Sequence, residues 1–457
     1  MTAEATDRAA AAPAAKPRPT IHLTAENGWI NDPYGVTWVD DRYHLFYQAI
    51  PGRVTWAPNC HWGHAESIDL VHWVEQPLAL VPQAFEIGCW SGSFVMDGDQ
   101  PTILYTRIIG GDLGYGRVAI AYGDELATTW VSAEEDVVID GPPTQIDVHS
   151  FRDPYVFRSD TGEWRAILAA GLADGSGAAL QYHSADLRRW TYDGVICSRR
   201  SDSGDDVWTG SLWECPQLFA IGADWVLLIS VWDNDILHYV AGAIGDYDGT
   251  TFTPRRWQRL TYGSSAYAMS AFIDKEGRRC VISWLREEPQ NDPDLLLRAG
   301  AHSIVSTISV LDGSLVLRPH PDVDNLRGRP LEAQRLGNSA SYDIGPGAVD
   351  LVLKHGDVAT VLVQDGDAVR ARLEIDPISL LCSRPGLAAE RVPFDHPASD
   401  AEVRILLDAD LLEVFGPGTY GAFRIPPAAD PQHTTLVLEG AAPVSSRACI
   451  LDNACSM

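Results

Sequence analysis

Residues 67–73 read SIDLVHW, and residues 184–190 read SADLRRW, with Ser, Asp, Leu and Trp at the same four places. Weaker copies lie at 123–130, which reads GDELATTW, and at 245–248, which reads GDYD. The aspartates of these four copies are 55, 62 and 60 residues apart; they are Asp69, Asp124, Asp186 and Asp246. The chain therefore contains a repeat with a period near 60 residues.

The sequence between the repeats is typical of β-strands. Short apolar runs such as 43–47 (YHLFY), 102–105 (TILY) and 226–229 (VLLI) are bounded by Gly, Pro and Asp, and no long amphipathic helix interrupts them. A period of this length in an all-β chain favours one four-stranded sheet per repeat, arranged radially as propeller blades. Four markers and a last β-rich segment, 266–320, predict five blades. The alternative interpretation is chance similarity between surface turns.

The repeat ends near residue 320, where a Pro-rich and polar sequence begins. Beyond it, roughly 341–447, short strands return without the repeat, which fits a β-sandwich. We therefore predict an all-β protein, a five-bladed β-propeller followed by a C-terminal β-sandwich. The expected divisions are a disordered tail at 1–20, the propeller at 21–325, a linker at 326–340 and the sandwich at 341–457.

Composition excludes several classes of protein. The 457 residues carry a net charge of −28, which argues against binding to nucleic acid or to anionic membranes. The eight cysteines are scattered without a C-x-x-C pair, a pattern of free thiols in a reducing compartment. Residues 1–20 are rich in Ala and Pro without the apolar core of a secretory signal, and no apolar run is long enough to span a membrane. These features predict a cytoplasmic protein.

Three acidic motifs stand at the starts of different repeats. Asp32 lies in WINDPYG (29–35), Asp153 in FRDP (151–154) and Glu214 in WECPQ (213–217). The innermost strand of every propeller blade lines the central channel, so these carboxylates are expected to meet in one axial pocket. Crowded like charges raise at least one pKa, which leaves a proton available for acid catalysis. Glycoside cleavage with retention needs one ionised and one protonated carboxylate placed in this way.

Each motif also has a local interpretation. Asn-Asp-Pro-x-Gly is a turn sequence, in which Pro33 biases Asp32 toward an extended backbone and Gly35 accepts a positive φ. Arg152 and Asp153 could be a local ion pair, and Glu214 could be a surface residue of an edge strand. The placement of all three motifs at blade starts favours the shared site.

The sequence resembles glycoside hydrolase family 32, which comprises invertases, levanases, inulinases and related fructosyltransferases. The resemblance extends from residue 21 to about 425 and implies the same propeller followed by a sandwich. It rests on motifs in the family's order: 26–33 (ENGWINDP), 43–48 (YHLFYQ), 56–58 (WAP), 61–65 (HWGHA), 69–73 (DLVHW), 90–93 (WSGS), 152–154 (RDP), 213–216 (WECP), 404–408 (RILLD) and 412–415 (LEVF).

The resemblance also implies roles. Asp32 is expected to be the nucleophile, Glu214 the general acid and then the base, and Asp153 a stabiliser of the oxocarbenium-like transition state. The implied activity is a retaining β-fructofuranosidase, a hydrolase that removes terminal fructosyl units from sucrose or short fructans, phosphorylated or not, without cofactor or metal. Residues that match the fructose pocket are Asn31, Gln48, Trp56, Trp90, Ser91 and Arg152.

The chain departs from the family at four places. Tyr34 replaces a usual second Asn, Gln217 a common Asp and Trp90 a usual Phe, and STISV at 306–310 replaces a Leu-Pro-Arg-Glu-Leu type segment. The three carboxylates remain. The departures bear on the leaving-group side of the pocket and on the choice of substrate.

Other functions stay open at this point. The same chemistry serves a fructosyltransferase, in which a sugar hydroxyl replaces water, and an inactive carbohydrate-binding protein could keep the same pocket. Five-bladed arabinan- or xylan-cleaving enzymes share the architecture but not the two acidic motifs at 29–33 and 214–216. A zinc site at Cys60, His61 and His64 is not favoured, because no matching second group of ligands occurs elsewhere in the sequence. Gly110-Gly111 and Gly175-x-Gly177 are turns rather than phosphate loops.

Overall fold

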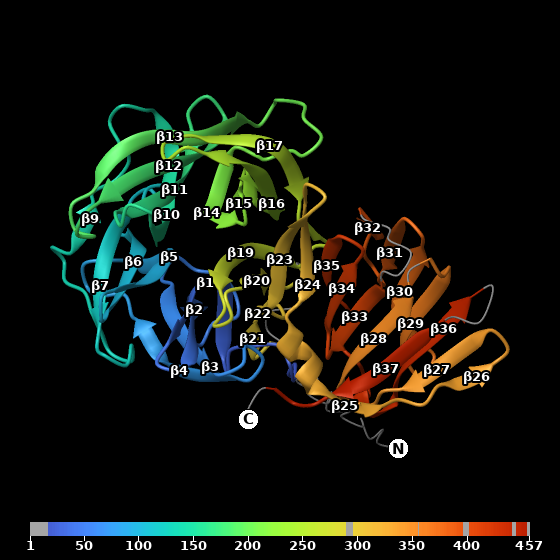
Figure 1. Ribbon diagram of the computed structural model, residues 1–457. Helices are drawn as coiled ribbons and strands as arrows, with labels where there is room; N and C mark the ends of the chain where they lie inside the picture. The colour runs from blue at the N-terminus through green and yellow to red at the C-terminus, as the bar shows by residue number, and fades with distance from the viewer. Residues whose placement is uncertain (1–16, 289–295, 355, 396–401, 441–444, 455–457) are drawn as a thin grey trace, which may run out of the picture.

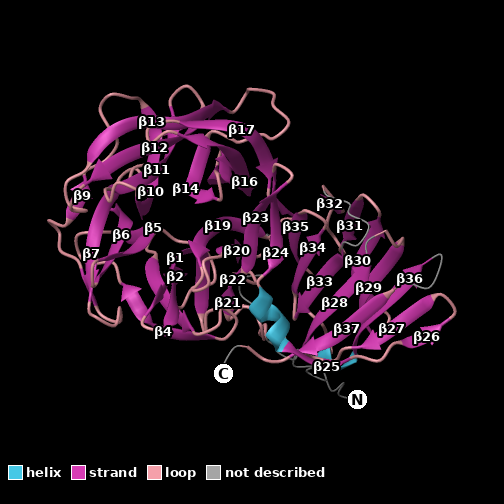
Figure 2. Cartoon of the chain, viewed as in Figure 1, coloured by secondary structure: helices cyan, strands magenta, loops and turns pink. Residues whose placement is uncertain are grey.

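The computed structural model describes residues 17–288, 296–354, 356–395, 402–440 and 445–454. Strands make up nearly all of this, and the helices there are short 3₁₀ turns, η2 (Pro321–Leu326) and η3 (Pro431–His433) (Figure 2). Five sheets surround a central axis, and two larger sheets stack beside them (Figure 1). The expected all-β architecture, a five-bladed propeller followed by a sandwich, is confirmed. Within the described residues, no helix combines the length and apolar character needed to cross a membrane.

Each blade is an antiparallel sheet whose first strand is innermost. The parallel strand β21 (Arg298–Ala299) comes late in the chain and pairs with β1, so it ties the last blade to the first. The blades, in chain order, are β1 (Gly28–Val39), β2 (Arg42–Ile50), β3 (His61–Ser67) and β4 (Trp73–Leu80); β5 (Gly88–Asp97), β6 (Gln100–Ile108), β7 (Arg117–Gly123), β8 (Trp130–Val131) and β9 (Val137–Ile139); β10 (Val148–Arg158), β11 (Trp164–Leu172), β12 (Ser176–Ser184) and β13 (Thr191–Arg200); β14 (Leu212–Ile221), β15 (Asp224–Asp233), β16 (Ile236–Tyr247) and β17 (Phe252–Arg259); β19 (Ala266–Ile273), β20 (Arg279–Leu285), β22 (Ala301–His302), β23 (Ser306–Leu311) and β24 (Ser314–Pro319).

The sequence repeat forms the turn between the third and fourth strands of a blade. Asp69 Oδ1 accepts the backbone N–H groups of residues 71 and 72 at 3.2 and 2.9 Å, and Asp186 Oδ1 accepts those of residues 188 and 189 at 3.1 and 2.9 Å. The leucine that follows each aspartate has a positive φ, 64° and 60°. In the fourth blade the carboxylate that caps this turn is Asp248, two residues beyond the predicted marker, because β16 runs on to residue 247.

The two stacked sheets have seven strands each. One sheet contains β18 (Thr261–Tyr262), a segment that leaves the propeller and pairs in parallel with β35. This sheet is therefore continuous across the two domains. Its order is β18, β35 (Thr419–Arg424), β34 (Leu411–Gly416), β33 (Glu402–Asp408), β28 (Ala348–Lys354), β37 (Ser446–Leu451) and β25 (Arg327–Pro330). The other has the order β26 (Gln334–Leu336), β27 (Ser339–Asp343), β36 (Thr434–Gly440), β29 (Ala359–Asp365), β30 (Ala368–Asp376), β31 (Ser379–Ser383) and β32 (Glu390–Pro393).

Two expected segments are structured differently. Strands β25 and β26 lie in the stretch 326–340 that was interpreted as a linker, so most of this stretch belongs to the sandwich sheets. Its polar text reflects edge strands, which expose side chains on both faces. In the expected tail 1–20, residues 17–20 are described, and the backbone N–H of Thr20 bonds to Asp408 Oδ1 at 2.8 Å; the rest lies outside the described residues.

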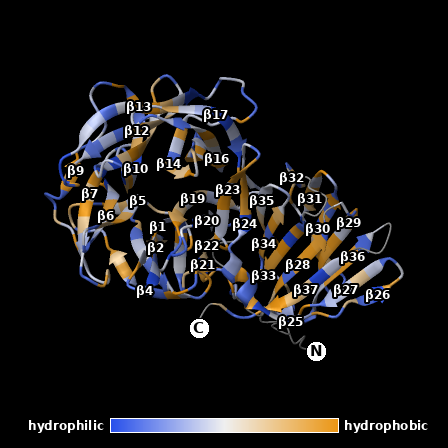
Figure 3. Ribbon diagram, viewed as in Figure 1, coloured by the Kyte–Doolittle hydropathy of each residue, from blue (hydrophilic) through white to orange (hydrophobic). Residues whose placement is uncertain are grey.

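The sandwich core follows the period of two that strands impose on their side chains. Val349, Leu351 and Leu353 of β28 alternate inward against Val361 and Val363 of β29. Hydrophobic stretches mark these strands in Figure 3. The cysteines of the described residues are free thiols, so packing and hydrogen bonds hold both domains.

A buried charged network joins the two domains. His22 Nδ1 lies 2.8 Å from Asp408 Oδ2, and His22 Nε2 lies 2.7 Å from Glu413 Oε2. Glu413 also accepts the Tyr420 hydroxyl and the backbone N–H of Ile304. Burial alone would lower the pKa of His22, but hydrogen bonds and attraction from the two carboxylates raise it to about 9. The imidazolium therefore bridges the start of the propeller and the sandwich.

We expect His22→Gln to lower the free energy of unfolding at pH 7 by about 3–5 kcal/mol, because it leaves two buried carboxylates without their cation. A folded pKa above the ordinary 6.5 gives stability that is complete below pH 6.5 and lost as the pH rises through about 9. Urea unfolding between pH 6 and 10 should show this decline in the parent. The variant should show a flatter profile, and equal slopes would contradict the assignment.

Candidate active site

The carboxylate of Asp32 is held in place by a chain of hydrogen bonds. Ser91 Oγ–H donates to Asp32 Oδ2 at 2.8 Å, and Asn31 Nδ2 donates to Asp32 Oδ1 at 3.1 Å. Gln48 links these two donors: its Oε1 accepts from Asn31 at 2.6 Å and its Nε2 donates to Ser91 at 2.9 Å. Trp29 Nε1–H fixes Asn31 from the other side at 3.0 Å. Three residues expected from the sequence, joined by Trp29, thus form one network around a single carboxylate.

Irregular backbone places these side chains. Between residues 30 and 33, two residues of β1 face one residue of β2, which is a β-bulge. The other inner strands break register at the same level of the channel, where a bulge turns a side chain toward the axis. The breaks lie between Trp90 and Gly92, Arg152 and Tyr155, Glu214 and Gln217, and Tyr267 and Ser270.

Three bulges contain a non-glycine residue in the left-handed region. The φ values are 58° at Asp153, 47° at Cys215 and 46° at Ala268. Such a conformation costs on the order of 1 kcal/mol per residue and persists only where surrounding structure fixes it. The Asp153 N–H donates to Thr106 Oγ1 at 2.8 Å, which holds the strained peptide against the neighbouring blade.

Glu214 is bound through both carboxylate oxygens. Arg152 Nη2 donates to Oε1 at 2.8 Å, and the Tyr267 hydroxyl donates to Oε2 at 2.7 Å. The side chain of Glu214 is 17% exposed, whereas that of Arg152 is 9% exposed. Glu214 is therefore oriented by two blades while one part of it still faces solvent.

Asp153 is held by contacts from two blades. Its Oδ2 accepts the backbone N–H of Cys215 at 3.1 Å and lies 3.8 Å from Arg152 Nε. The Cys215 Sγ is 3.7 Å from Asp32 Oδ2 and 3.9 Å from Asp153 Oδ2, so it fills the space between the two carboxylates. The pKa of this thiol is raised well above its usual range by burial and by the nearby acids. It is kept as a neutral spacer.

The acids are electrostatically coupled. Burial, together with the charge of Glu214, raises the pKa of Asp32 to about 6. Burial raises the pKa of Asp153 to about 7, with Glu214 and Asp32 adding to the effect and Arg152 opposing it. Asp32 and Asp153 therefore hold a proton to a higher pH than a free aspartate does.

Aromatic side chains flank the acids where the inner strands begin. Trp56 is 45% exposed, and its ring meets the Trp90 ring edge to face with 5.8 Å between the centroids. Trp90 Nε1–H is anchored on Pro58 O at 2.8 Å, and Trp29 packs against Trp284 at 5.5 Å. Flat apolar faces beside carboxylates are suited to sugar rings. All nine residues proposed from the sequence thus lie in or beside one site.

Sequence reasoning missed Tyr267 and His302. Tyr267 stands immediately before the bulge of β19, as Glu214 does on β14, so comparison of blade against blade could have found it. His302 Nε2 contacts the backbone oxygen of Asn31 at 2.8 Å from β22. Neither the sequence around His302 nor its spacing signals this contact.

The departures Tyr34 and Gln217 lie beyond the acids on their strands. Tyr34 is buried against Trp62, with ring centroids 4.1 Å apart. Gln217 Oε1 accepts the backbone N–H of Ala271 at 2.7 Å. Both face the far part of the channel rather than the aromatic side chains around the acids, because they follow the bulges. They line the far cavity and the small pocket beside Asp153 and Cys215.

Candidate metal ligands lie elsewhere in the described chain. His64 contacts His44, with 3.0 Å between Nε2 and Nδ1, instead of joining Cys60 and His61. Two groups bring three ligand atoms within 4.8 Å of one another, and in each group at least two members already contact one another by a hydrogen bond or an ion pair. They are His44, His64 and Glu66, and Asp274, Cys280 and His320.

Because the folded pKa of Asp32 is raised, the folded state holds its proton more tightly than the unfolded chain, and stability is lost as the pH rises from about 4 through about 6. We expect Asp32→Asn to raise the free energy of unfolding at pH 8 by about 1–3 kcal/mol and to have little effect at pH 4. Urea unfolding at the two pH values measures this. Asp186→Asn is the matched control: its turn N–H groups lower the pKa of Asp186 to about 2, so it should gain nothing at pH 8.

Comparison with known proteins gives the same assignment from sequence and from structure. Residues 22–319 match the family described as Glycosyl hydrolases family 32 N-terminal domain. Sucrose-6-phosphate hydrolase of Escherichia coli is 31% identical over 423 residues, which cover 87% of this chain and 86% of that protein. Levanase of Bacillus subtilis is 34% identical over 301 residues, 59% of this chain and 41% of the levanase.

The fold matches solved structures over nearly the whole chain. The GH32 β-fructofuranosidase BmSUC1 of Bombyx mori superposes with a TM-score of 0.84 and 25% identity, covering 96% of this chain and 95% of the other. A mutant of the same enzyme in complex with sucrose superposes with the same TM-score and 26% identity, again covering 96% and 95%. With three blades contributing acids to one channel site, this chain belongs to family 32 of the glycoside hydrolases.

Proposed function

We propose that the protein is a retaining β-fructofuranosidase that removes terminal β-D-fructofuranosyl units from sucrose or short fructans by double displacement. The observation that supports this proposal is the set of carboxylates that three blades bring together, in which Asp32 accepts hydrogen bonds from two donors. Asp32 attacks C2 of the fructosyl unit, and the bond to the leaving sugar breaks as a covalent fructosyl-enzyme forms. Water then releases fructose and regenerates Asp32.

The hydrogen bonds around Asp32 support its role as nucleophile. Ser91 and Asn31 each bind one of its oxygens, so the carboxylate keeps a fixed direction instead of rotating freely. A fixed orientation of the attacking group can raise the rate of such a displacement by several orders of magnitude. Gln48 and Trp29 lock the two donors, which explains why pocket residues cluster around this one acid.

Glu214 fits the role of acid in the first step and base in the second. It is oriented by one partner on each oxygen. Arg152 Nη2 donates to Oε1, and the Tyr267 hydroxyl, which can donate or accept, contacts Oε2. Asp153 adds negative charge beside the oxocarbenium-like transition state, because the neighbouring guanidinium balances part of its burial cost.

A small sucrose-type donor, phosphorylated or not, is the substrate class that we infer. Similar proteins are named as hydrolases of sucrose 6-phosphate and as an invertase of raffinose, and one structural neighbour holds sucrose. The exposed Trp56 beside Trp90 offers a flat surface for the second sugar. Analysis of the products distinguishes water from a sugar hydroxyl as the acceptor of the fructosyl unit.

Purified protein with sucrose should release fructose and glucose in equal amounts, and proton NMR during the first minutes should show fructose formed with retained configuration. Asp32→Asn should lower kcat by at least about 10⁴-fold, because the displacement loses its nucleophile. The control is Asp186→Asn, the same substitution in a turn of the third blade, which should keep full activity. Glucose released in excess of fructose would mean transfer to sugar, and an inactive parent would contradict an enzyme.

Glu214→Gln should separate the acid role from binding. We expect hydrolysis of sucrose to fall by about 10²–10⁴-fold, because the leaving sugar no longer receives a proton. With an aryl fructoside, whose phenolate leaves unaided, the first step should be nearly unchanged, and a burst of phenolate should precede slow turnover. Equal losses on both substrates would exclude Glu214 as the acid.

A further inference from the structure

A second cavity occupies the far part of the propeller channel. Its volume is about 850 Å³, which is within the range of sites for small molecules. Residues of all five inner strands that follow the bulges line it, so it lies beyond the acids from the aromatic side chains. A much smaller pocket of about 20 Å³ beside Asp153 and Cys215 shares Tyr155 and Gln217 with it.

Three arginines line the cavity, and two of them have acidic partners. Arg158 pairs with Asp97 at 2.8 Å, and Arg165 pairs with Asp193 at 3.0 Å. Arg279 has no carboxylate partner among the described residues: it stacks on Phe219 at 4.8 Å and reaches only the backbone oxygen of Ala220, at 3.4 Å. An arginine without a counter-ion is notable in a chain of net charge −28.

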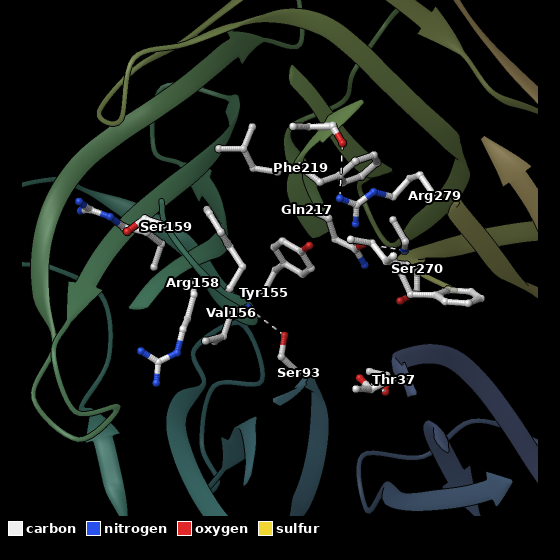
Figure 4. A pocket seen from close by; sticks show the side chains of 18 of the residues that line it. Thr37, Ser93, Tyr155, Val156, Arg158, Ser159, Gln217, Phe219, Ser270 and Arg279 are labelled. Carbon is white, nitrogen blue, oxygen red and sulfur yellow. Dashed lines mark hydrogen bonds between the residues drawn. The ribbon is translucent and has the colours of Figure 1, made fainter. Parts of the chain in front are cut away.

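Further hydrogen-bond donors lie on the same side of the cavity. Gln217 uses its Oε1 to accept the backbone N–H of Ala271, so its amide NH₂ is left to donate. Tyr155, Gln217 and Arg279 line the same cavity, and in the view of Figure 4 their polar ends are drawn toward the same part of it. These three groups can donate hydrogen bonds to one bound ligand at the same time.

The acidic residues of the lining are turned to other partners or to solvent. Asp248 Oδ1 accepts the backbone N–H groups of residues 250 and 251, both at 2.8 Å. Asp160 lies in the exposed turn between β10 and β11. The part of the cavity around Arg279 is therefore the positive part.

We propose that this far cavity is a second ligand site, which binds a small phosphate-type oxyanion through Arg279, Gln217 and Tyr155. A guanidinium gives paired hydrogen bonds to such an anion, and neutral donors complete its coordination. A neutral sugar would leave the unpaired charge of Arg279 uncompensated, so the anion is the better occupant. Free phosphate and the phosphate group of a phosphorylated sugar present the same chemistry. The site is independent of the reaction proposed above.

Isothermal titration of the full-length protein with inorganic phosphate at low ionic strength tests the site. We expect saturable binding at one site, below about 10 mM. Gln217→Glu keeps the acceptor oxygen for Ala271 but adds a negative charge beside Arg279, so it should weaken binding at least about tenfold. Arg279→Gln should do the same. Arg318→Gln, which removes an exposed positive charge on β24, should leave binding unchanged.

Asp32→Asn separates the two sites, since phosphate binding in the far cavity should survive it. Glucose 6-phosphate, titrated in parallel, identifies the source: affinity well above that of phosphate and lost in Gln217→Glu indicates a sugar phosphate, and equal affinity indicates free phosphate. No saturable binding in the parent, or undiminished binding in Gln217→Glu with its fold confirmed by circular dichroism, would overturn the proposal.

Discussion

The active site depends on one constraint, a bulge in every inner strand at the same depth of the channel. A regular strand turns alternate side chains toward and away from the axis, so neighbouring residues such as Asn31 and Asp32 could not both serve one site. The bulges break this alternation and let consecutive residues share a function. Because five blades repeat the device, acids from distant parts of the chain meet at one level, and the rest of the propeller holds that level fixed.

This arrangement stores electrostatic and conformational strain at its centre. Asp153 and Cys215 have left-handed backbones, and the acids repel one another in a partly buried place. The surroundings oppose that strain with specific contacts, such as Thr106 under Asp153 and Arg152 beside Glu214. A site of this kind is less stable than a neutral one of the same shape, which is common where a protein uses charge for chemistry.

Much of the fold follows from the sequence, because its turns have a chemical signature. Asp69 and Asp186 can be recognised since each caps a turn that needs an aspartate. In the fourth blade the sequence points to Asp246 as the marker, whereas Asp248, two residues later, caps the turn. The sandwich strands at 327–330 and 334–336 were hidden, since edge strands are polar on both sides. The acids are predictable from their motifs, whereas Tyr267 has no motif of its own: a tyrosine in an apolar strand signals packing first, and only its position before the bulge, compared with that of Glu214, indicates its contact.

The contact between the domains bears on how the chain can be divided. Residues 20–22, just before the first inner strand, bind Asp408, and β18 extends a sandwich sheet from within the propeller. The start of the propeller is therefore held by residues that are synthesised nearly four hundred positions later. The pairing of β21 with β1 closes the ring from within the propeller, but the segment that leads into β1 gains its Asp408 contacts only once the sandwich has been synthesised. Exchange of the sandwich between relatives would have to carry the residues before β1 with it.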